Sequence, residues 1–290
     1  MKLVFKTDPD LSFLHAIAVV ATTGATIDEK LEAAVREPAA VINERLELAE
    51  LSVGKFWQSL VAGPASHDSA RIELARIERS LLAAGCAELG IDSLTPVVSG
   101  RLADARLAFR ERFPKLADQL PLRARPLKEL WEATGPGTLR QIARRTVDTL
   151  IPAKTTVHLL QPVSGGGGGL LEEAPAVWLE AVLAHPDPAI PETLRIAWLV
   201  ARKGVDQGNQ THLEDPHRWR HLAALALVPI VLAAGAELGV CEASESRLAA
   251  AAQLWADLDD VDPLLRWWQE MQQQQLPLPI AIKALDKMMG

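Results

Sequence analysis

The chain has 290 residues, of which 49% are apolar, and its formal net charge at pH 7 is −7. A chain of this length can bury about three quarters of its unfolded surface, so it needs no disulfide framework to fold. Its two cysteines, Cys86 and Cys241, lie in alanine-rich runs and outside any zinc-binding spacing. They therefore predict buried thiols in a reducing compartment.

The beginning of the chain does not have the pattern of a secretory signal, because Asp8, Pro9 and Asp10 precede any long apolar stretch. The most membrane-like segment, 222–236, carries no charge. It is shorter than the ~18 residues typical of a membrane span and is interrupted by Pro229. We expect this segment to be a buried core helix of a cytoplasmic protein that has no membrane partner.

Helix signals recur along the whole chain. Thr26 and Glu29 form a capping box, which predicts a helix start, and Pro38 is expected to end that helix. Asp215, followed by proline, and Ser244 have the form of N-caps for later helices. The pattern predicts about ten to twelve helical segments joined by short connections.

Strand signals are few. The runs 3–5 and 155–160 are short and β-branched or aromatic, and Pro152 and Pro162 bound the second run. Two such strands can pair with each other but cannot organise a large sheet. We therefore predict a mainly α fold, a multi-helix globular protein with at most a minimal two-strand β element.

A serine followed by five glycines, Ser164 to Gly169, interrupts this pattern. We predict a Gly-rich linker or loop at 164–169 between an N-terminal helical half, 1–163, and a C-terminal helical half, 170–290. A phosphate-binding loop is the alternative, but no Lys-Ser/Thr follows the glycines. The helix expected from Leu170 onward would also open with two glutamates, which repel a phosphate.

The candidate metal ligands are His217 and His221, which the i, i+4 spacing places on one helix face, with His212 just upstream. These residues support the alternative of a metal-dependent hydrolase that binds zinc. Against it, Arg218 stands where metallopeptidases of similar spacing carry the catalytic glutamate, and Arg220 adds a second positive charge. We favour a solvated helix start that pairs with nearby acids, and no cofactor.

The segment 101–145 is basic, with eleven Lys or Arg residues and five acids. Its net charge of +6 leaves −13 for the rest of the chain. Arg140, Arg144 and Arg145 are the candidates for binding an anion or nucleic acid. We favour the alternative that the segment docks on the acidic remainder of the same chain.

No motif for nucleophilic catalysis is present, since the sequence contains no G-x-S-x-G. The tryptophans Trp255, Trp267 and Trp268 are expected in the core rather than in an exposed partner patch. The sequence therefore predicts a non-enzymatic helical interaction or regulatory protein whose partner is a protein. The metal-dependent hydrolase and the anion or nucleic-acid binder are the two alternatives.

Overall fold

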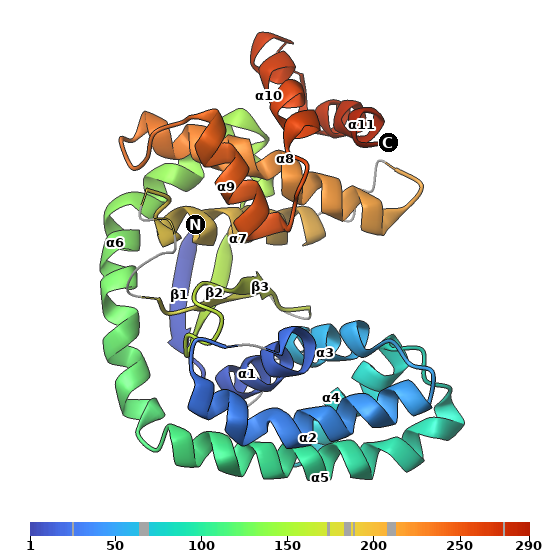
Figure 1. Cartoon of the computed structure of the whole chain (residues 1–290). Coiled ribbons are helices and arrows are strands. Elements are labelled where there is room, and N and C mark those ends of the chain that lie inside the picture. Colours follow the sequence, from blue (N-terminus) through green and yellow to red (C-terminus); the bar gives the residue numbers. More distant parts are fainter. Residues whose placement is uncertain are drawn as a thin grey trace.

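The computed structural model describes residues 1–24, 26–63, 70–172, 175–182, 187, 189–207, 213–274 and 276–290. These residues form eleven α-helices, one 3-10 helix and four strands (Figure 1). The strands are β1 (Lys2–Thr7), β2 (Lys154–Leu160), β3 (Gly168–Leu170) and β4 (Ala176–Glu180). The helices are α1 (Pro9–Thr23), α2 (Glu29–Leu48), α3 (Val53–Ala62), α4 (Ala70–Ala83), α5 (Glu88–Arg112), α6 (Leu116–Arg145), the 3-10 helix η1 (Asp148–Leu150), α7 (Glu192–Gln207), α8 (Pro216–Glu237), α9 (Glu245–Ala256), α10 (Asp262–Gln274) and α11 (Leu278–Met289).

The strands form one mixed sheet in the order β1-β2-β4-β3. β1, β2 and β4 are parallel, with Phe5 opposite Val157 and Val157 opposite Val177, whereas β3 runs antiparallel to β4. The mainly α class and the strands β1 and β2 are confirmed, but the limit of two strands is wrong. β3 was missed because glycine is depleted from strands, and β4 because a short apolar run has no strand-specific period.

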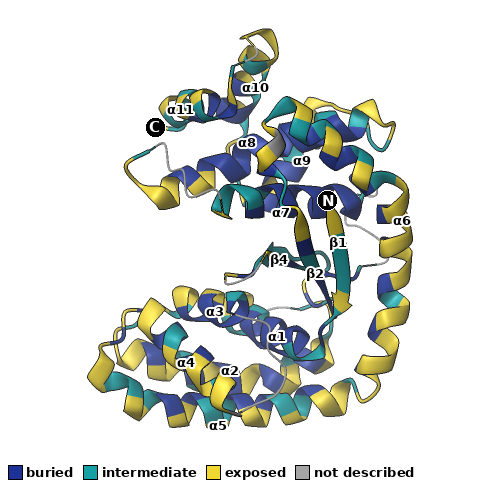
Figure 2. Cartoon of the chain, turned by 180° about the vertical axis from the view of Figure 1, so that it is seen from behind, coloured by how far each residue is buried: buried dark blue, intermediate teal, exposed yellow. Residues whose placement is uncertain are grey.

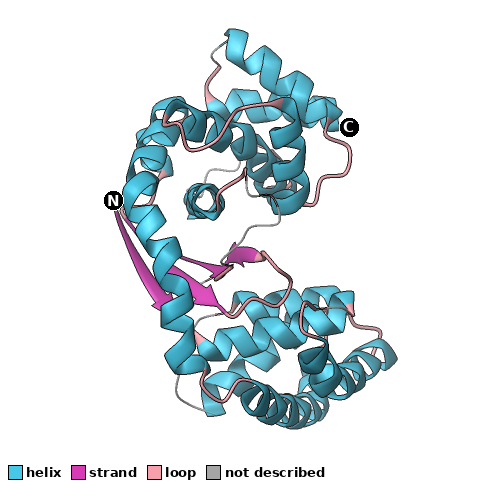
Figure 3. Cartoon of the chain, turned by 60° about the vertical axis from the view of Figure 1, so that its left-hand side comes forward, coloured by secondary structure: helices cyan, strands magenta, loops and turns pink. Residues whose placement is uncertain are grey.

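The sheet lies between two groups of helices. α1 to α5 gather at the end toward which β1 runs, and α7 to α11 gather at the opposite end (Figures 1 and 3). α6 connects the two groups and curves past the sheet in both views. Three prolines inside α6, Pro121, Pro126 and Pro136, account for this curvature, because each one removes a helical hydrogen bond.

Two of the predicted helix boundaries differ from the structure. α2 is capped by Asp28, whose Oδ1 accepts a hydrogen bond from the Leu31 amide at 3.0 Å, while the Thr26 hydroxyl bonds the backbone of Asp28. α2 also continues through Pro38, which is buried, so the prediction that Pro38 ends the helix is wrong. The burial of the helix around Pro38 compensates for the one hydrogen bond that proline removes.

The caps predicted at Asp215 and Ser244 are confirmed. Their side chains accept hydrogen bonds from the amides of His217 and Arg247 at 2.7 and 3.3 Å. The prediction of a helix directly after the glycine run is wrong, because β3 occupies that position and Leu171 lies outside any helix.

α8 is the core helix of the second group. Within the described residues it is the one helix long and apolar enough to span a membrane, and 78% of its apolar window is buried inside the protein. Figure 2 shows α7 and α8 buried along much of their length, with exposed outer faces on α5 and α6. This burial confirms the core helix expected at 222–236 and is compatible with a soluble protein.

The glycine run does not separate the strands. β2 precedes it and β4 follows it, and the two pair in parallel. The division into halves 1–163 and 170–290 stays a prediction.

Candidate functional site

Polar side chains gather at the carboxyl edge of the sheet. Asp8 follows β1, Gln161 follows β2, and Glu180 ends β4. Because β1, β2 and β4 are parallel, their carboxyl ends meet at one edge, where ligand sites of open sheets commonly lie. The parallel arrangement therefore makes this edge a candidate site.

Glu180, which is 0% exposed, is the centre of this edge. Its Oε1 lies 2.7 Å from His15 Nε2 and accepts bonds from the Ser164 amide and hydroxyl at 2.8 and 2.9 Å. Its Oε2 accepts a bond from the Gly166 amide at 2.7 Å. Burial alone raises the pKa of Glu180, but these hydrogen bonds and the charge of His15 outweigh it and lower the pKa to about 2.

The glycine run closes around this carboxylate. A Cβ at Gly167 would lie 3.1 Å from the Ser164 hydroxyl and 3.4 Å from Glu180 Oε1. Backbone amides that converge on one point, as those of Ser164 and Gly166 do, bind anions. Here the anion that they bind is a carboxylate of the protein itself.

A second histidine–carboxylate pair joins β1 to β2. The Asp8 Oδ2 atom lies 2.9 Å from His158 Nδ1, and its Oδ1 caps α1 by accepting a bond from the Leu11 amide at 2.9 Å. The Ser12 hydroxyl donates to the Asp8 carbonyl and accepts a bond from the Gln161 amide. These groups satisfy one another, and the Ser164 hydroxyl bonds Glu180 rather than an imidazole. The side chains that the structure describes at this edge therefore hold the fold together and include no activated nucleophile.

The candidate metal ligands lie at the start of α8. His217 and His221 are exposed, and His212 lies outside the described residues. Burial and the positive charges of Arg202 and Arg218 lower the pKa of His221. Across the described part of the chain, no three His, Cys, Asp or Glu side chains form a group that could hold a metal ion. The zinc hypothesis stays a prediction.

The arginines of this turn have acidic partners. Arg218 pairs with Asp286 of α11, and Arg220 pairs with Asp206 of α7 at 3.1 Å. These pairs hold the start of α8 against its neighbours.

The candidate anion-binding arginines at the end of α6 have different surroundings. Arg145 pairs with Glu237 of α8, whereas Arg144 is exposed. Arg140 is also exposed and lines an apolar cavity of about 500 Å³ with Trp131 and Leu139. Arg144 also lies close enough to Glu237 to lower the pKa of that carboxylate together with Arg145. The proposed role of the three arginines in binding an anion or nucleic acid stays a prediction.

Other basic residues of 101–145 pair with acids outside the segment. Arg106 contacts Glu73 at 2.9 Å, and Arg112 contacts Asp28 at 2.7 Å. Ion pairs within the chain thus neutralise part of the positive charge of the segment 101–145.

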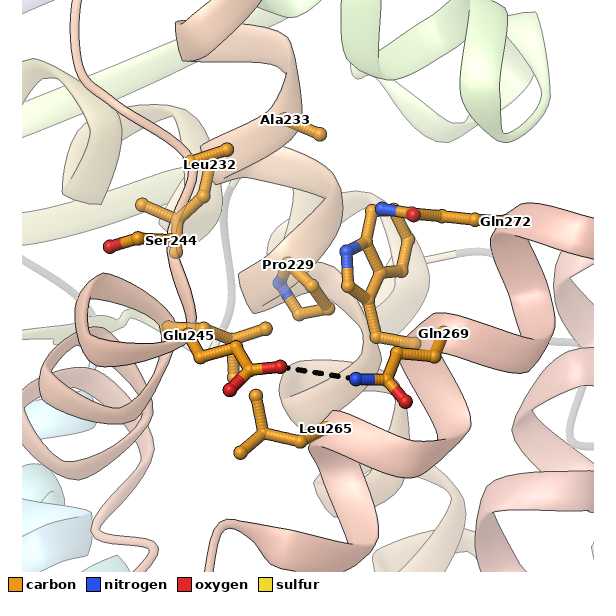
Figure 4. Close-up of a pocket in the computed structure, with 11 residues that line it drawn as sticks. Pro229, Leu232, Ala233, Ser244, Glu245, Leu265, Gln269 and Gln272 are labelled. Carbon is orange, nitrogen blue, oxygen red and sulfur yellow. Dashed lines mark hydrogen bonds between the residues drawn. The ribbon is translucent and has the colours of Figure 1, made fainter.

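A groove runs between α8, α9 and α10 (Figure 4). Pro229 and Leu232 of α8 face Leu265 of α10 across it, and its volume is about 200 Å³. At its edge, Glu245 Oε1 accepts a hydrogen bond from Gln269 Nε2 at 3.1 Å. The groove is therefore apolar inside and polar at its rim.

The two adjacent tryptophans of α10 differ in burial and in surroundings. Trp267 is 1% exposed, and its Nε1 donates to the Ala281 carbonyl of α11 at 2.7 Å. Trp268 is half-buried and lines the groove. The expectation that both belong to the core therefore fits Trp267 more closely than Trp268.

Sequence reasoning missed His15, His158 and Glu180, because their partners lie far along the chain. The one local signal was at Asp8, which is followed by proline, as the predicted cap Asp215 is. The groove gave no local signal, because it combines residues of three helices.

No family model matches this chain, and the comparisons with curated proteins and with solved structures found no match.

Proposed function

We propose that this protein is a non-enzymatic interaction protein that binds a basic, apolar segment of a partner protein in the groove between α8, α9 and α10. The observation that carries this proposal is an exposed groove with an apolar interior. Its volume of about 200 Å³ suits one or two large apolar side chains. Such pockets receive the anchor residues of a partner, which contribute most of the binding energy.

The charge around the groove supports a basic partner. Residues 242–270 contain seven acids and two basic residues, and one of the two, Arg247, is paired with Asp187 at 3.1 Å. Glu245 stands at the rim itself. Complementary charge of this kind speeds association and selects among partners.

Hydrogen bonds anchor two of the helices that form the groove, which favours binding without large rearrangement. Trp267 fixes α10 to α11 through its bond to Ala281, and Ser244 caps the start of α9. Preorganised walls reduce the entropy lost on binding. We place this interaction in the cytoplasm, in keeping with the two cysteines, which form no disulfide.

The test uses a synthetic helical peptide with leucines along one face and lysines on the rest, compared with a peptide in which glutamate replaces lysine. We expect the lysine peptide to bind at least about tenfold more tightly. Trp268→Ala should weaken it about tenfold, whereas Leu122→Ala, at an apolar residue 70% exposed on α6, should leave it unchanged. Glu245→Gln should weaken only the lysine peptide, and Glu132→Gln on α6 is its matched control.

Equal binding of the two peptides, or lysine-peptide binding that is indifferent to Trp268→Ala, would contradict the proposal. The first result would show that charge does not select the partner. The second would show that the peptide binds elsewhere on an acidic protein.

A further inference from the structure

A cavity of about 290 Å³ lies among α7, α8 and the C-terminal end of α9. Its walls include Arg202 of α7, His221 of α8 and Asp257, which directly follows α9. This volume is at the lower end of the range for small-molecule sites, so the cavity suits a small metabolite better than a protein segment.

Arg202 provides a positive wall. Its Cζ lies 4.5 Å from the centre of the Trp198 ring, and Trp198 is fixed by a bond from its Nε1 to the Ala224 carbonyl at 2.8 Å. The ring contact orients the guanidinium but uses none of its N–H donors. Within the described residues, Arg202 has no hydrogen-bond acceptor and no ion-pair partner.

The guanidinium keeps its charge at neutral pH. Burial lowers the pKa of Arg202 to about 10, against the opposing effect of Asp206. Asp206 is itself occupied, since it pairs with Lys203 and Arg220, each at 3.1 Å. The donors of Arg202 are therefore free for a ligand.

The end of α9 provides a negative wall. Asp257 has a φ of 51°, and its amide closes the helix by bonding the carbonyls of Ala252 and Gln253. Its carboxylate is exposed and has no partner among the described residues. The last carbonyls of a helix lack helical donors and carry the negative end of the helix dipole, so this wall attracts a cation.

Two further groups line the cavity. Trp255 is 7% exposed, and its indole N–H has no acceptor within the described part of the chain. The other is His221, whose pKa is lowered by partial burial and by Arg202 and Arg218. A neutral imidazole has one donor and one acceptor and can serve either end of a ligand.

We propose that this cavity binds a free α-amino acid, with its carboxylate against Arg202 and its ammonium against Asp257 and the end of α9. Opposite charges face the same cavity and do not pair with each other, so a ligand that carries both charges satisfies both walls. A simple anion would be repelled by Asp257 and the end of α9. A simple cation would be repelled by Arg202.

The first experiment is calorimetric titration of the full chain with each common L-α-amino acid in turn. At least one should bind, with a Kd of about 1 mM or lower. For that amino acid, the amide, which lacks the carboxylate, and the deaminated acid, which lacks the ammonium, should each bind at least about tenfold more weakly. Inorganic phosphate serves as the probe that carries negative charge alone and should not bind.

Two variants remove one wall each. Arg202→Met removes the cation, and Asp257→Asn removes the carboxylate with a residue that tolerates positive φ. Each should weaken binding at least about tenfold. Arg266→Met and Asp259→Asn, at exposed positions outside the cavity, are the matched controls and should leave the Kd unchanged.

Asp257→Asn changes an exposed side chain, so it tests the site even if Arg202→Met fails to fold. The proposal is overturned if no amino acid binds, or if the deaminated acid binds as tightly as its parent. It is also overturned if phosphate binds through Arg202 while no amino acid does, because the site would then be one for anions alone.

Discussion

Glu180 is a fully buried charged group and Arg202 a half-buried one, and the two have opposite surroundings. The Glu180 carboxylate receives hydrogen bonds from Ser164 and Gly166 and contacts His15 at 2.7 Å. The Arg202 guanidinium lies on an aromatic ring beside a cavity, and no described residue accepts its hydrogen bonds. A buried charge whose hydrogen bonds are all made within the chain stabilises the fold. A charged group beside a cavity that lacks such partners is available to a ligand.

The largest expected effect is that of Glu180→Gln. The amide has one oxygen and one NH2 group, so its N–H donors would face either the donors of Ser164 or the Gly166 amide, and the charge opposite His15 would be lost. Breaking a buried pair in this way costs about 3–5 kcal/mol in the free energy of unfolding. Denaturant unfolding of the variant and the wild type measures it, with the exposed Glu270→Gln as control. A loss below about 1 kcal/mol would show that Glu180 is not a structural centre.

Protonation of Glu180 at low pH should also reduce the free energy of unfolding, by somewhat less than the substitution Glu180→Gln does. The pKa of Glu180 is lowered from 4.5 to about 2 in the folded protein, so the stabilisation is complete above pH 4.5 and is lost as the pH falls toward 2. This shift corresponds to about 3 kcal/mol. Unfolding measured at pH 5 and near pH 2 should show a smaller pH-dependent loss in Glu180→Gln than in the wild type. Equal losses in the two proteins would assign the acid sensitivity to other carboxylates.

Gly166→Ala tests the loop that encloses Glu180. Gly166 has a φ of 146°, a conformation nearly restricted to glycine, and its amide donates to Glu180. We expect a loss of about 2 kcal/mol in the free energy of unfolding. Gly100→Ala, in α5 with nothing within 4 Å of the new methyl group, should instead stabilise the protein by about 0.5–1 kcal/mol. A neutral result at Gly166 would mean that the loop relaxes without cost.

The smallest effect is expected for Arg202→Met in the absence of ligand. The variant loses the contact with Trp198 but relieves the burial of a charge that has no acceptor, so the two changes nearly cancel. We expect a shift within about 1 kcal/mol, measured by the same unfolding experiment. A loss as large as that of Glu180→Gln would erase the difference between the two regions and make Arg202 structural.

The sequence predicted the features that depend on neighbouring residues. The caps at Asp215 and Ser244, the buried helix at 222–236 and the strands β1 and β2 each have a local pattern of capping, hydropathy or β-branching. The same patterns indicated a mainly α fold. Pro38 was misleading because its effect on a helix depends on the packing around it.

The tertiary structure alone decided which charges are paired. Asp8 and His158 are 150 residues apart in the chain, and His15 and Glu180 are 165 apart. Similarly, the sequence offered His221 as a candidate metal ligand, and only the fold shows that it lies beside Arg202 in a cavity that the end of α9 also lines. Capping and hydropathy act within a few residues and can be predicted from the sequence. The pairing of a buried charge is set by which distant elements the fold brings together, and no local pattern encodes it.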